Sequence, residues 1–419
     1  MSSMDLLQYV DPLIGSYNGG NVFVGATRPY SLAKAVADVN GENTAGFATD
    51  GSQVTGFSLV HDSGTGGNPS LGNFPVFPEL CPEEDINNCV YSKTARGVNY
   101  VNSSVSARPG HFALDLTNGI HAEMAVGQRA ALYSFTFPNS AATNQAKYSN
   151  SSAGPAAVNG SNISPLVLLD LTDLYDTRQN ATISVDPDTG RMTGNGTFLP
   201  SFGSGYYVMH FCADFGSTDT SMRDNGLHVN YRAGIQPKDI FVTRGINAFY
   251  VQAGGWVRFN ASTSANDTTV LVRQGISYIS AEQACANAEV DIPGVVGDWN
   301  MQTLVNDTQD EWRQKLSTVS ITPGNGTASN LLTLLYSAMY RTMIQPQNYT
   351  GENPLWDSGV PYFDSFYCIW DTFRTPFPFL TIIDPEGLAQ MVRSLIDIQQ
   401  HVGWLPDCRM SLCKGFTQG

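Results

Sequence analysis

The sequence predicts a β-sandwich domain followed by a helical domain, and three observations support this fold class. Residues 1 to about 275 show short apolar alternations separated by Gly, Asn and Asp, a pattern typical of antiparallel strands. Near Ser280 the hydrophobic period changes from about 2 to about 3.6 residues, as it does where strands give way to helices. A chain of 419 residues is also too long for one ordinary hydrophobic core, so we expect two domains. We therefore expect a β-sandwich at 1–275, a helical connector at 276–297 and a helical domain at 298–419.

Two hairpins anchor the β prediction. Phe112–Thr117 and Ile120–Met124 flank Asn118-Gly119, a strong hairpin signal because both central residues of such a turn need positive φ. Residues 183–185 and 191–193 flank Asp186-Pro187-Asp188-Thr189-Gly190 in the same way. Further strands are expected at Leu166–Leu169, Tyr206–Phe215, Gly255–Phe259 and Thr269–Arg273.

The helical part has recognisable start and stop signals. Ser280-Ala281-Glu282-Gln283 fits a capping box, and Asp384-Pro385 begins a helix that Gly403 ends. Three earlier segments also carry helical spacing: 281–289, 298–316 and 328–345. Apolar residues cover most of the third segment, which suits an inner helix packed on several sides: Leu331, Leu332, Leu334, Leu335, Ala338 and Met339. Successive helices with aromatic residues between them indicate the opening of a helical toroid, and we expect only its first part before Gly419.

The charge and the apolar pattern argue against nucleic-acid binding and against a membrane span. The formal net charge of -15 and the lack of a basic cluster argue against nucleic-acid binding. No apolar run is long enough for a membrane span.

Sequons favour a secretory route. Eleven Asn-x-Ser/Thr sequons are present, and glycans at such sites keep loops solvated. They lie at Asn102, Asn150, Asn159, Asn162, Asn180, Asn195, Asn260, Asn266, Asn306, Asn325 and Asn348. The first residues show neither a basic nor an apolar signal region, which leaves an upstream start or a cytoplasmic protein as alternatives.

Seven cysteines give a weaker indication of the same route. Cys81 and Cys89 flank an acidic loop that a small disulfide would close. The other five have no obvious partners in the sequence: Cys212, Cys285, Cys368, Cys408 and Cys413. The odd count leaves at least one cysteine unpaired within the chain.

The strongest functional signal is an aromatic stretch, Tyr362 to Arg374, followed by Gly403-Trp404-Leu405-Pro406. Aromatic faces beside carboxylate and guanidinium groups are the composition of a carbohydrate subsite. The alternative is core packing, because aromatic runs are more often buried than functional. Asp371 and Arg374 favour the subsite, since charges one helical turn apart among so many rings need partners or a function.

These residues carry a family resemblance. Val10–Gly15, Gly19–Tyr30 and Gly56–Gly66 resemble the N-terminal signatures of glycoside hydrolase family 92. Trp370–Arg374 and Gly403–Pro406 resemble the next two motifs of that family, in the same order. The resemblance implies an N-terminal β-sandwich set against an (α/α)6 catalytic barrel. It also implies a calcium-dependent, exo-acting, inverting α-mannosidase that removes mostly α-1,2-linked mannose from N-glycans or mannoproteins.

The resemblance assigns site residues. Asp371 becomes a ligand of sugar hydroxyls, with Trp370, Arg374 and Trp404 shaping the subsite. The loop His61-Asp62-Ser63-Gly64-Thr65-Gly66 is expected to reach the barrel mouth and help form the pocket for the sugar beyond the scissile bond; the alternative is an ordinary hydrated turn. Family sequences usually carry a second histidine where this chain has Leu59.

The catalytic carboxylates of the family are not matched. Its acid motif, Leu-Glu-Tyr followed by paired acids, and its base motif, Gly-Asn-Asp-Asp, are absent, and we expect both beyond Gly419. Most calcium ligands are expected there too, so we assign no catalytic residue and no metal ligand to this chain. Asp364 and Asp371 lie in one segment and not on opposed walls, and Asp384 is better explained as a helix N-cap.

Two other functions stay open. Without the acid and base, the chain would be a catalytically incomplete sugar-binding or scaffold fragment. An amidase that releases N-glycans would need an activated cysteine, and Cys368 alone lies in the candidate site, with no histidine near it in sequence. The remaining histidines are not spaced as zinc ligands: His111, His121, His210, His228 and His401. His121 and His210 are most simply strand residues.

Overall fold

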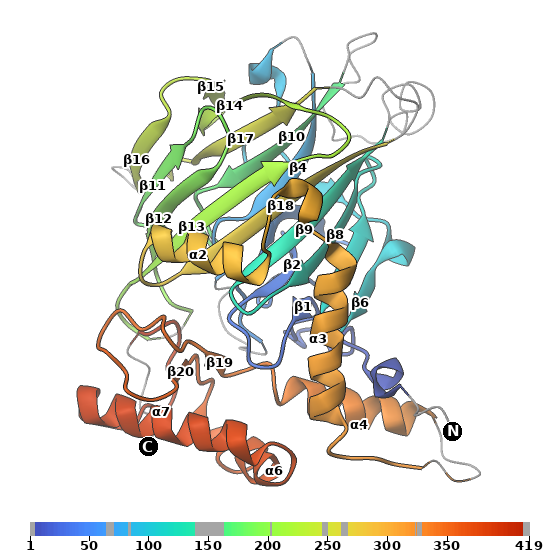
Figure 1. Ribbon diagram of the computed structural model, residues 1–419, viewed down its shortest axis with the longest axis vertical. Coiled ribbons are helices and arrows are strands. Elements are labelled where there is room, and N and C mark those ends of the chain that lie inside the picture. Colours follow the sequence, from blue (N-terminus) through green and yellow to red (C-terminus); the bar gives the residue numbers. More distant parts are fainter. Residues whose placement is uncertain are drawn as a thin grey trace.

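The computed structural model shows a β-rich N-terminal part and a helical C-terminal part, which confirms the predicted order of the two classes (Figure 1). The structure describes residues 5–63, 71–82, 85–138, 163–201, 203–244, 250–260, 267–322, 324 and 329–413. Within these residues the strands form two nine-stranded sheets and one small two-stranded sheet.

The strand pairs of the first large sheet are antiparallel. Its order is β1 (Ala26–Thr27), β2 (Lys34–Val39), β3 (Gln53–Ser58), β4 (Val76–Pro82), β10 (Ile163–Asp170), β17 (Ala253–Phe259), β14 (Met222–Val229) and β15 (Arg232–Gly234), with β5 (Val98–Asn99) paired to β3.

The second large sheet is also antiparallel. Its order is β16 (Asp239–Thr243), β11 (Asn180–Val185), β12 (Met192–Phe198), β13 (Tyr207–Gly216), β18 (Thr268–Ser277), β9 (Ala130–Phe137), β8 (His121–Val126), β7 (His111–Asp115) and β6 (Ser106–Arg108).

The two sheets pack face to face. The rings of Phe57 on β3 and Phe135 on β9 lie 5.3 Å apart between centroids. Gly255 on β17 lies so close to the other sheet that an added Cβ would be 2.5 Å from the sulfur of Met192 on β12. Buried and partly exposed residues alternate along β12, as expected when only one face of a strand is packed.

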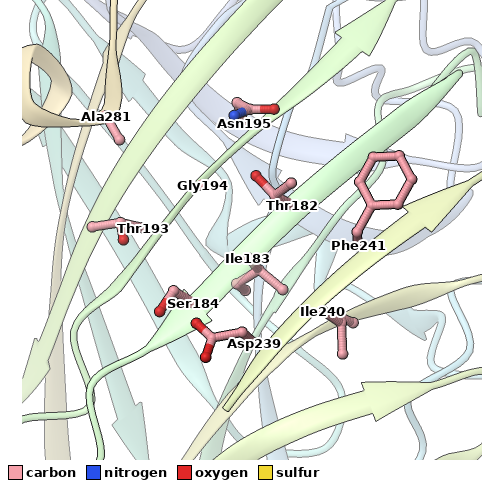
Figure 2. Close-up of a pocket in the computed structure, with 10 residues that line it drawn as sticks. All are labelled: Thr182, Ile183, Ser184, Thr193, Gly194, Asn195, Asp239, Ile240, Phe241 and Ala281. Atoms are coloured by element: carbon pink, nitrogen blue, oxygen red, sulfur yellow. The ribbon is translucent and has the colours of Figure 1, made fainter. Parts of the chain in front are cut away.

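Both predicted hairpins are confirmed. β7 and β8 form an antiparallel pair in which Asp115 lies opposite His121 next to the turn, and Gly119 in the turn has a φ of 93°. Only Gly119 takes positive φ in that turn, so it is not the two-residue turn that the sequence predicted. β11 pairs with β12 on one side and with β16 on the other (Figure 2). The predicted strands at Leu166–Leu169, Gly255–Phe259 and Thr269–Arg273 lie within β10, β17 and β18, and the one at Tyr206–Phe215 begins one residue before β13.

The predicted N-cap of α2 (Ala281–Asp291) is confirmed, with the Ser280 hydroxyl accepting a bond from the Gln283 N–H at 3.1 Å. The Gln283 side-chain amide donates to Asn287 at 2.9 Å, and the return bond of the predicted capping box is not seen among the described residues. α3 (Met301–Leu316) begins three residues later than predicted, because the side chain of Asn300 caps it and a separate 3-10 turn precedes it. α4 (Ser329–Arg341) follows, and it ends four residues before the predicted limit.

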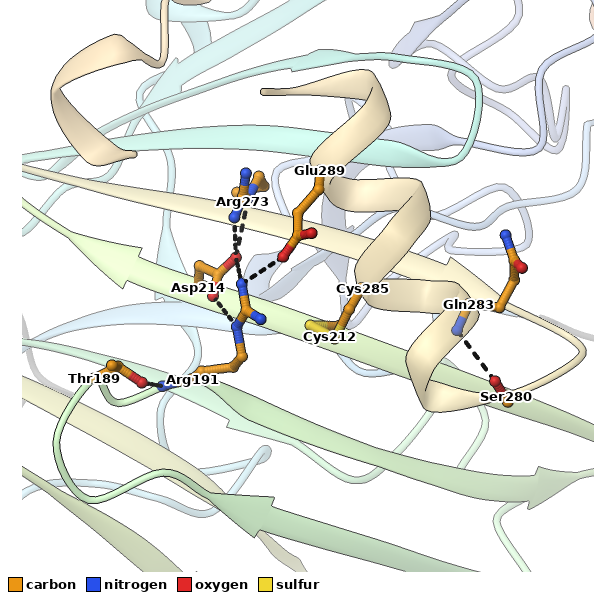
Figure 3. Close-up of a disulfide and its surroundings, with 9 residues drawn as sticks. All are labelled: Thr189, Arg191, Cys212, Asp214, Arg273, Ser280, Gln283, Cys285 and Glu289. Atoms are coloured by element: carbon orange, nitrogen blue, oxygen red, sulfur yellow. Dashed lines mark hydrogen bonds and ion pairs between the residues drawn. A yellow bond between two sulfur atoms is a disulfide. The ribbon is translucent and has the colours of Figure 1, made fainter. Parts of the chain in front are cut away.

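α2 lies on the outer face of the second sheet and is fastened there (Figure 3). A disulfide joins Cys285 of α2 to Cys212 of β13, two cysteines that the sequence left without partners. Arg191 bridges Asp214 of β13 at 2.6 Å and Glu289 of α2 at 2.9 Å. The helix therefore covers the middle of the sheet and leaves β11 and β16 uncovered by it.

The later helices are α5 (Ile369–Thr372), α6 (Pro376–Ile383) and α7 (Pro385–Val402). Asp384 caps α7 by accepting from the Gly387 N–H, and Gly403 ends it with a φ of 97°, as predicted. Figure 1 shows α4, α6 and α7 gathered beyond one end of the sheets. Between α4 and α5, the short strands β19 (Gln347–Asn348) and β20 (Phe363–Asp364) pair.

The prediction of an inner helix packed on several sides is wrong for α4 in this structure. Leu332 and Met339 are buried, but Leu331 and Leu334 are each 60% exposed. In the described residues α4 packs through one face only, against the N-terminal segment and α3. The (α/α)6 toroid itself stays a proposal.

One continuous hydrophobic core runs from between the sheets into the helical part, where it includes Trp312, Tyr336 and Met391. Among the described residues, no helix has the length and apolar character that a membrane crossing requires.

Candidate functional site

The two aromatic motifs of the helical part lie side by side. A disulfide joins Cys368, just before α5, to Cys408, just after the Trp404 motif. The Ile369 N–H donates to the backbone oxygen of Asp407 at 2.8 Å, and the Trp370 N–H donates to its carboxylate at 3.2 Å. These contacts fix the start of α5 against the chain that follows Trp404.

Of the predicted sugar-binding residues, Trp370 and Asp371 lie on α5 and Arg374 lies two residues beyond its end. The Arg374 guanidinium lies 4.7 Å from the centroid of the Trp370 ring and 3.1 Å from the Asp371 carboxylate. Trp370 is 45% exposed and Trp404 is 49% exposed. Open ring faces beside an acid and a guanidinium are what a sugar ring and its hydroxyls bind.

A buried ion pair supports this surface from beneath. Asp364 is fully buried and accepts from the Arg409 Nε at 2.8 Å and from the Tyr362 hydroxyl at 2.7 Å. The backbone N–H groups of Ser365 and Leu412 donate to its other oxygen. Burial and the Asp364 carboxylate raise the pKa of the Tyr362 hydroxyl. Asp364 therefore holds the segment in place.

His61 begins the loop of the β part that the resemblance placed in the site. Its ring is fully buried, with Nε2 2.8 Å from the Asp38 carboxylate and 3.1 Å from the Ser58 hydroxyl. Nδ1 lies 2.7 Å from the backbone oxygen of Lys34. Leu59, at the position where the resemblance led us to expect a second histidine, is also fully buried. The ring has no open edge for a sugar, so His61 supports the loop.

Asp62 and Ser63 continue this loop toward the helical part. Asp62 is fully buried and accepts from the Ser201 hydroxyl at 3.0 Å. The Ser63 N–H donates to the side-chain oxygen of Gln345 at 2.9 Å, and the Gln345 amide donates to the backbone oxygen of Ser365 at 2.9 Å. Gln345 thus links the loop to the aromatic segment. Gly64, Thr65 and Gly66 lie outside the described residues.

A buried lysine lies under the same loop. Lys34 is fully buried, and its ammonium makes no hydrogen bond within the described part of the chain. Burial lowers its pKa to about 7, and the nearby Asp62 carboxylate opposes this effect.

Comparison with known families settles the relationship. Residues 9–277 match the glycosyl hydrolase family 92 N-terminal domain, and residues 283–419 match the catalytic domain of the same family. The chain belongs to glycosyl hydrolase family 92. An uncharacterized secreted glycosidase of Arthroderma benhamiae is 48% identical over 99% of this chain, and the match covers 48% of that protein. The chain thus spans about half the length of this relative.

Solved structures give the same family fold. A family 92 α-mannosidase from Bacteroides thetaiotaomicron, in complex with mannoimidazole, superposes with a TM-score of 0.75 at 19% identity, covering 99% of this chain and 51% of that one. A family 92 inverting mannosidase from the same organism gives 0.76 at 18% identity, covering 100% and 52%. At such identities the likeness concerns the fold alone.

In this family 92 chain, Asp364, Asp371 and Asp384 all have side-chain partners, so none of them is a free carboxylate. Asp364 is saturated with donors, as described above. Asp371 pairs with Arg374. Asp384 caps α7 and also contacts the Lys315 ammonium at 2.7 Å and the Tyr30 hydroxyl at 2.9 Å.

Among the described residues, no three His, Cys, Asp or Glu side chains come together as a metal-binding group, and we assign no step of the reaction to calcium here.

The disulfide contradicts the amidase alternative on Cys368, since a bonded sulfur cannot be a thiolate nucleophile. Cys413 is the one free cysteine among the described residues; it is buried, and burial raises its pKa to about 12.

Three residues that hold the candidate site together were not predicted from the sequence. Gln345, Arg409 and Asp407 act through contacts with segments that are distant along the chain. The only local indication of Arg409 was its place directly after Cys408.

Proposed function

We propose that this chain is part of an exo-acting α-mannosidase that removes terminal mannose from N-glycans or mannoproteins. The observation that carries the proposal is the match of nearly the whole chain to both domains of family 92. Mannosidase structures of that family share its fold.

In this proposal the α5 surface binds the sugar. Trp370 and Trp404 offer their ring faces to the apolar side of the mannose ring. Asp371 and Arg374, now paired with each other, exchange that contact for bonds to sugar hydroxyls. Gln345 keeps the loop that begins at His61 in register with this surface.

The chemistry we propose is inverting hydrolysis of an α-1,2 linkage. That reaction needs a protonated carboxyl on the leaving oxygen and a carboxylate that activates water, about 6.5–9.5 Å apart. We place both outside these 419 residues, in the half of the relative that the chain does not span. Calcium binding is proposed for the whole protein, with ligands from outside the described residues.

A panel of mannosides tests the activity. The secreted protein, produced at the length of its fungal relative, should release mannose from α-1,2-mannobiose faster than from the α-1,3 or α-1,6 isomers. Proton NMR during the first turnovers should show β-mannose as the initial product. Release of α-mannose first would reject inversion, and equal rates on the three isomers would reject the linkage.

A second candidate function is sugar binding without catalysis. The observation in its favour is that Asp364, Asp371 and Asp384, the acids considered from the sequence as substitute catalysts, all have structural partners. Isothermal titration of the longer protein with α-1,2-mannobiose separates the two functions, because a binding protein would take up the disaccharide and leave it intact.

We also propose that the protein is secreted, with a cytoplasmic location as the alternative. The fungal relative is named as a secreted glycosidase. Three disulfides lie within the described residues, which favours an oxidising compartment. Expression of the complete gene in a eukaryotic host should place the protein in the medium, and retention in the cytosol would reject secretion.

A further inference from the structure

A shallow groove lies on the outer face of the second sheet, away from the candidate sugar site. It has a volume of about 440 Å³, and its floor is formed by β11 and β12. Phe241 of β16 stands on one side and Ala281, the first residue of α2, on the other (Figure 2). The groove exists because α2 covers the middle of the sheet and stops short of this edge.

The groove contains a sequon. Asn195 and Thr197 lie two residues apart on β12, so both side chains leave the same face of the sheet. Both are partly exposed, whereas their neighbours Gly194 and Gly196 are buried. Within the described part of the chain, no residue hydrogen-bonds the side-chain amide of Asn195, which leaves its nitrogen available. In contrast, the side-chain oxygen of Asn180, in a second sequon, accepts from Thr197 at 3.1 Å.

An exposed aromatic ring lies in the same row of side chains. Asn195 pairs with Thr182, and Thr182 pairs with Phe241, so the three residues cross three neighbouring strands on one face. Figure 2 shows the Thr182 side chain between the other two. Two strand spacings separate Asn195 from Phe241, or about 10 Å. Phe241 is 64% exposed on an edge strand, an arrangement that invites pairing with another chain unless something covers it.

We propose that Asn195 carries an N-linked glycan whose first sugar rings lie along this groove, over Thr182, and pack against Phe241. The apolar face of a sugar suits an aromatic ring, and the hydroxyls of Thr182, Ser184 and Thr193 suit its polar edge. The glycan covers the exposed ring and shields the β16 edge. This proposal requires passage through the secretory pathway and does not depend on mannosidase activity.

Glycopeptide mass spectrometry of the full protein, secreted from a eukaryotic host, tests occupancy. The peptide that contains Asn195 should carry a glycan, and enzymatic removal in heavy-oxygen water should label that position. An unmodified Asn195 would overturn the proposal.

Thermal unfolding tests the contact with Phe241. Asn195→Gln and Phe241→Ser should each lower the Tm of the glycosylated protein by about 2–4 °C, and the double variant should lose no more than either single variant. Asn102→Gln removes an exposed sequon far from the groove and should leave the Tm unchanged. Additive losses would show that the glycan and the ring act independently, which would overturn the packing.

The same variants distinguish an attached glycan from a free one. If unglycosylated Asn195→Gln protein bound α-1,2-mannobiose through Phe241 in saturation-transfer NMR, the groove would be a docking site for free sugar, and our assignment would be wrong. We expect no saturation transfer to the disaccharide, or a transfer that is the same with and without the Phe241 ring.

Discussion

Cys368 and Cys408 form a disulfide that joins the two aromatic motifs of the candidate sugar site across 40 residues of chain. Between them the chain runs through α5, α6 and α7 before it returns. The exposed rings of Trp370 and Trp404 therefore belong to segments whose ends are tied together, although each segment alone is short.

Removing this disulfide should loosen the site. Replacing both Cys368 and Cys408 by Ala should lower the free energy of unfolding of the helical part by about 2–4 kcal/mol, because the unfolded chain regains the freedom of the closed loop. Urea unfolding followed by tryptophan fluorescence measures the change. The matched control replaces Cys81 and Cys89, which are only eight positions apart in the sequence and lie in the β part. An unchanged transition in the Cys368 and Cys408 variant would mean that the bridge does not organise the site.

The buried pair of Asp364 and Arg409 should be sensitive to the loss of one partner. Asp364→Asn leaves the Arg409 guanidinium buried without its counter-charge, and we expect a loss of about 3–5 kcal/mol in the free energy of unfolding. Replacing both residues, Asp364→Leu with Arg409→Met, should recover part of that loss. If the single variant were as stable as the wild type, the pair would not be the support we describe.

Lys34 predicts a specific pH dependence. Its pKa is about 7 in the folded protein and 10.5 in the unfolded chain, so between these values the unfolded state binds more protons. This group therefore makes stability rise as pH increases from about 7 to 10.5. In Lys34→Met that contribution is absent. The free energy of unfolding of the wild type should therefore rise relative to that of the variant between about pH 7 and pH 10.5, and the difference should level off below pH 7. Parallel profiles from pH 7 to pH 10 would contradict the burial of a titrating lysine.

Asp371 and Arg374 should matter for activity and little for stability. Their side chains are 61% and 57% exposed, and exposed ion pairs contribute little to folding. In the protein at the length of its fungal relative, for which we propose activity, Asp371→Ala or Arg374→Ala should cost about 1–3 kcal/mol of transition-state binding, roughly a 5- to 150-fold loss in kcat/KM on α-1,2-mannobiose. Asp310→Ala is the control, since Asp310 pairs with Arg313 at the same spacing on α3. Equal effects of the two Asp variants on kcat/KM would remove Asp371 from the site.

The sequence predicted local structure well where one signal decides it. Ser280, Asp384 and Gly403 set helix ends through their own backbone neighbours, and alternation set the strands. The site depends on distant contacts that no local pattern encodes. Gln345 reaches both Ser63 and Ser365, and only the folded chain brings these together.

The burial of individual side chains could not be predicted from the sequence either. The composition of His61-Asp62-Ser63-Gly64 is typical of a hydrated turn, yet the side chains of His61 and Asp62 are fully buried. The same is true of α4, where Leu331 and Leu334 are each 60% exposed although their spacing predicted packing.

We propose that these 419 residues bind the sugar of an α-mannosidase while the acid and base lie elsewhere in the protein. Mannose release from α-1,2-mannobiose, measured with calcium added, for the 419 residues alone and for the protein at the length of its fungal relative, tests it most directly. We predict turnover by the longer protein and none by the 419 residues. Turnover by the 419 residues alone would place a catalytic carboxylate among them, and the absence of turnover by the longer protein would contradict the mannosidase assignment.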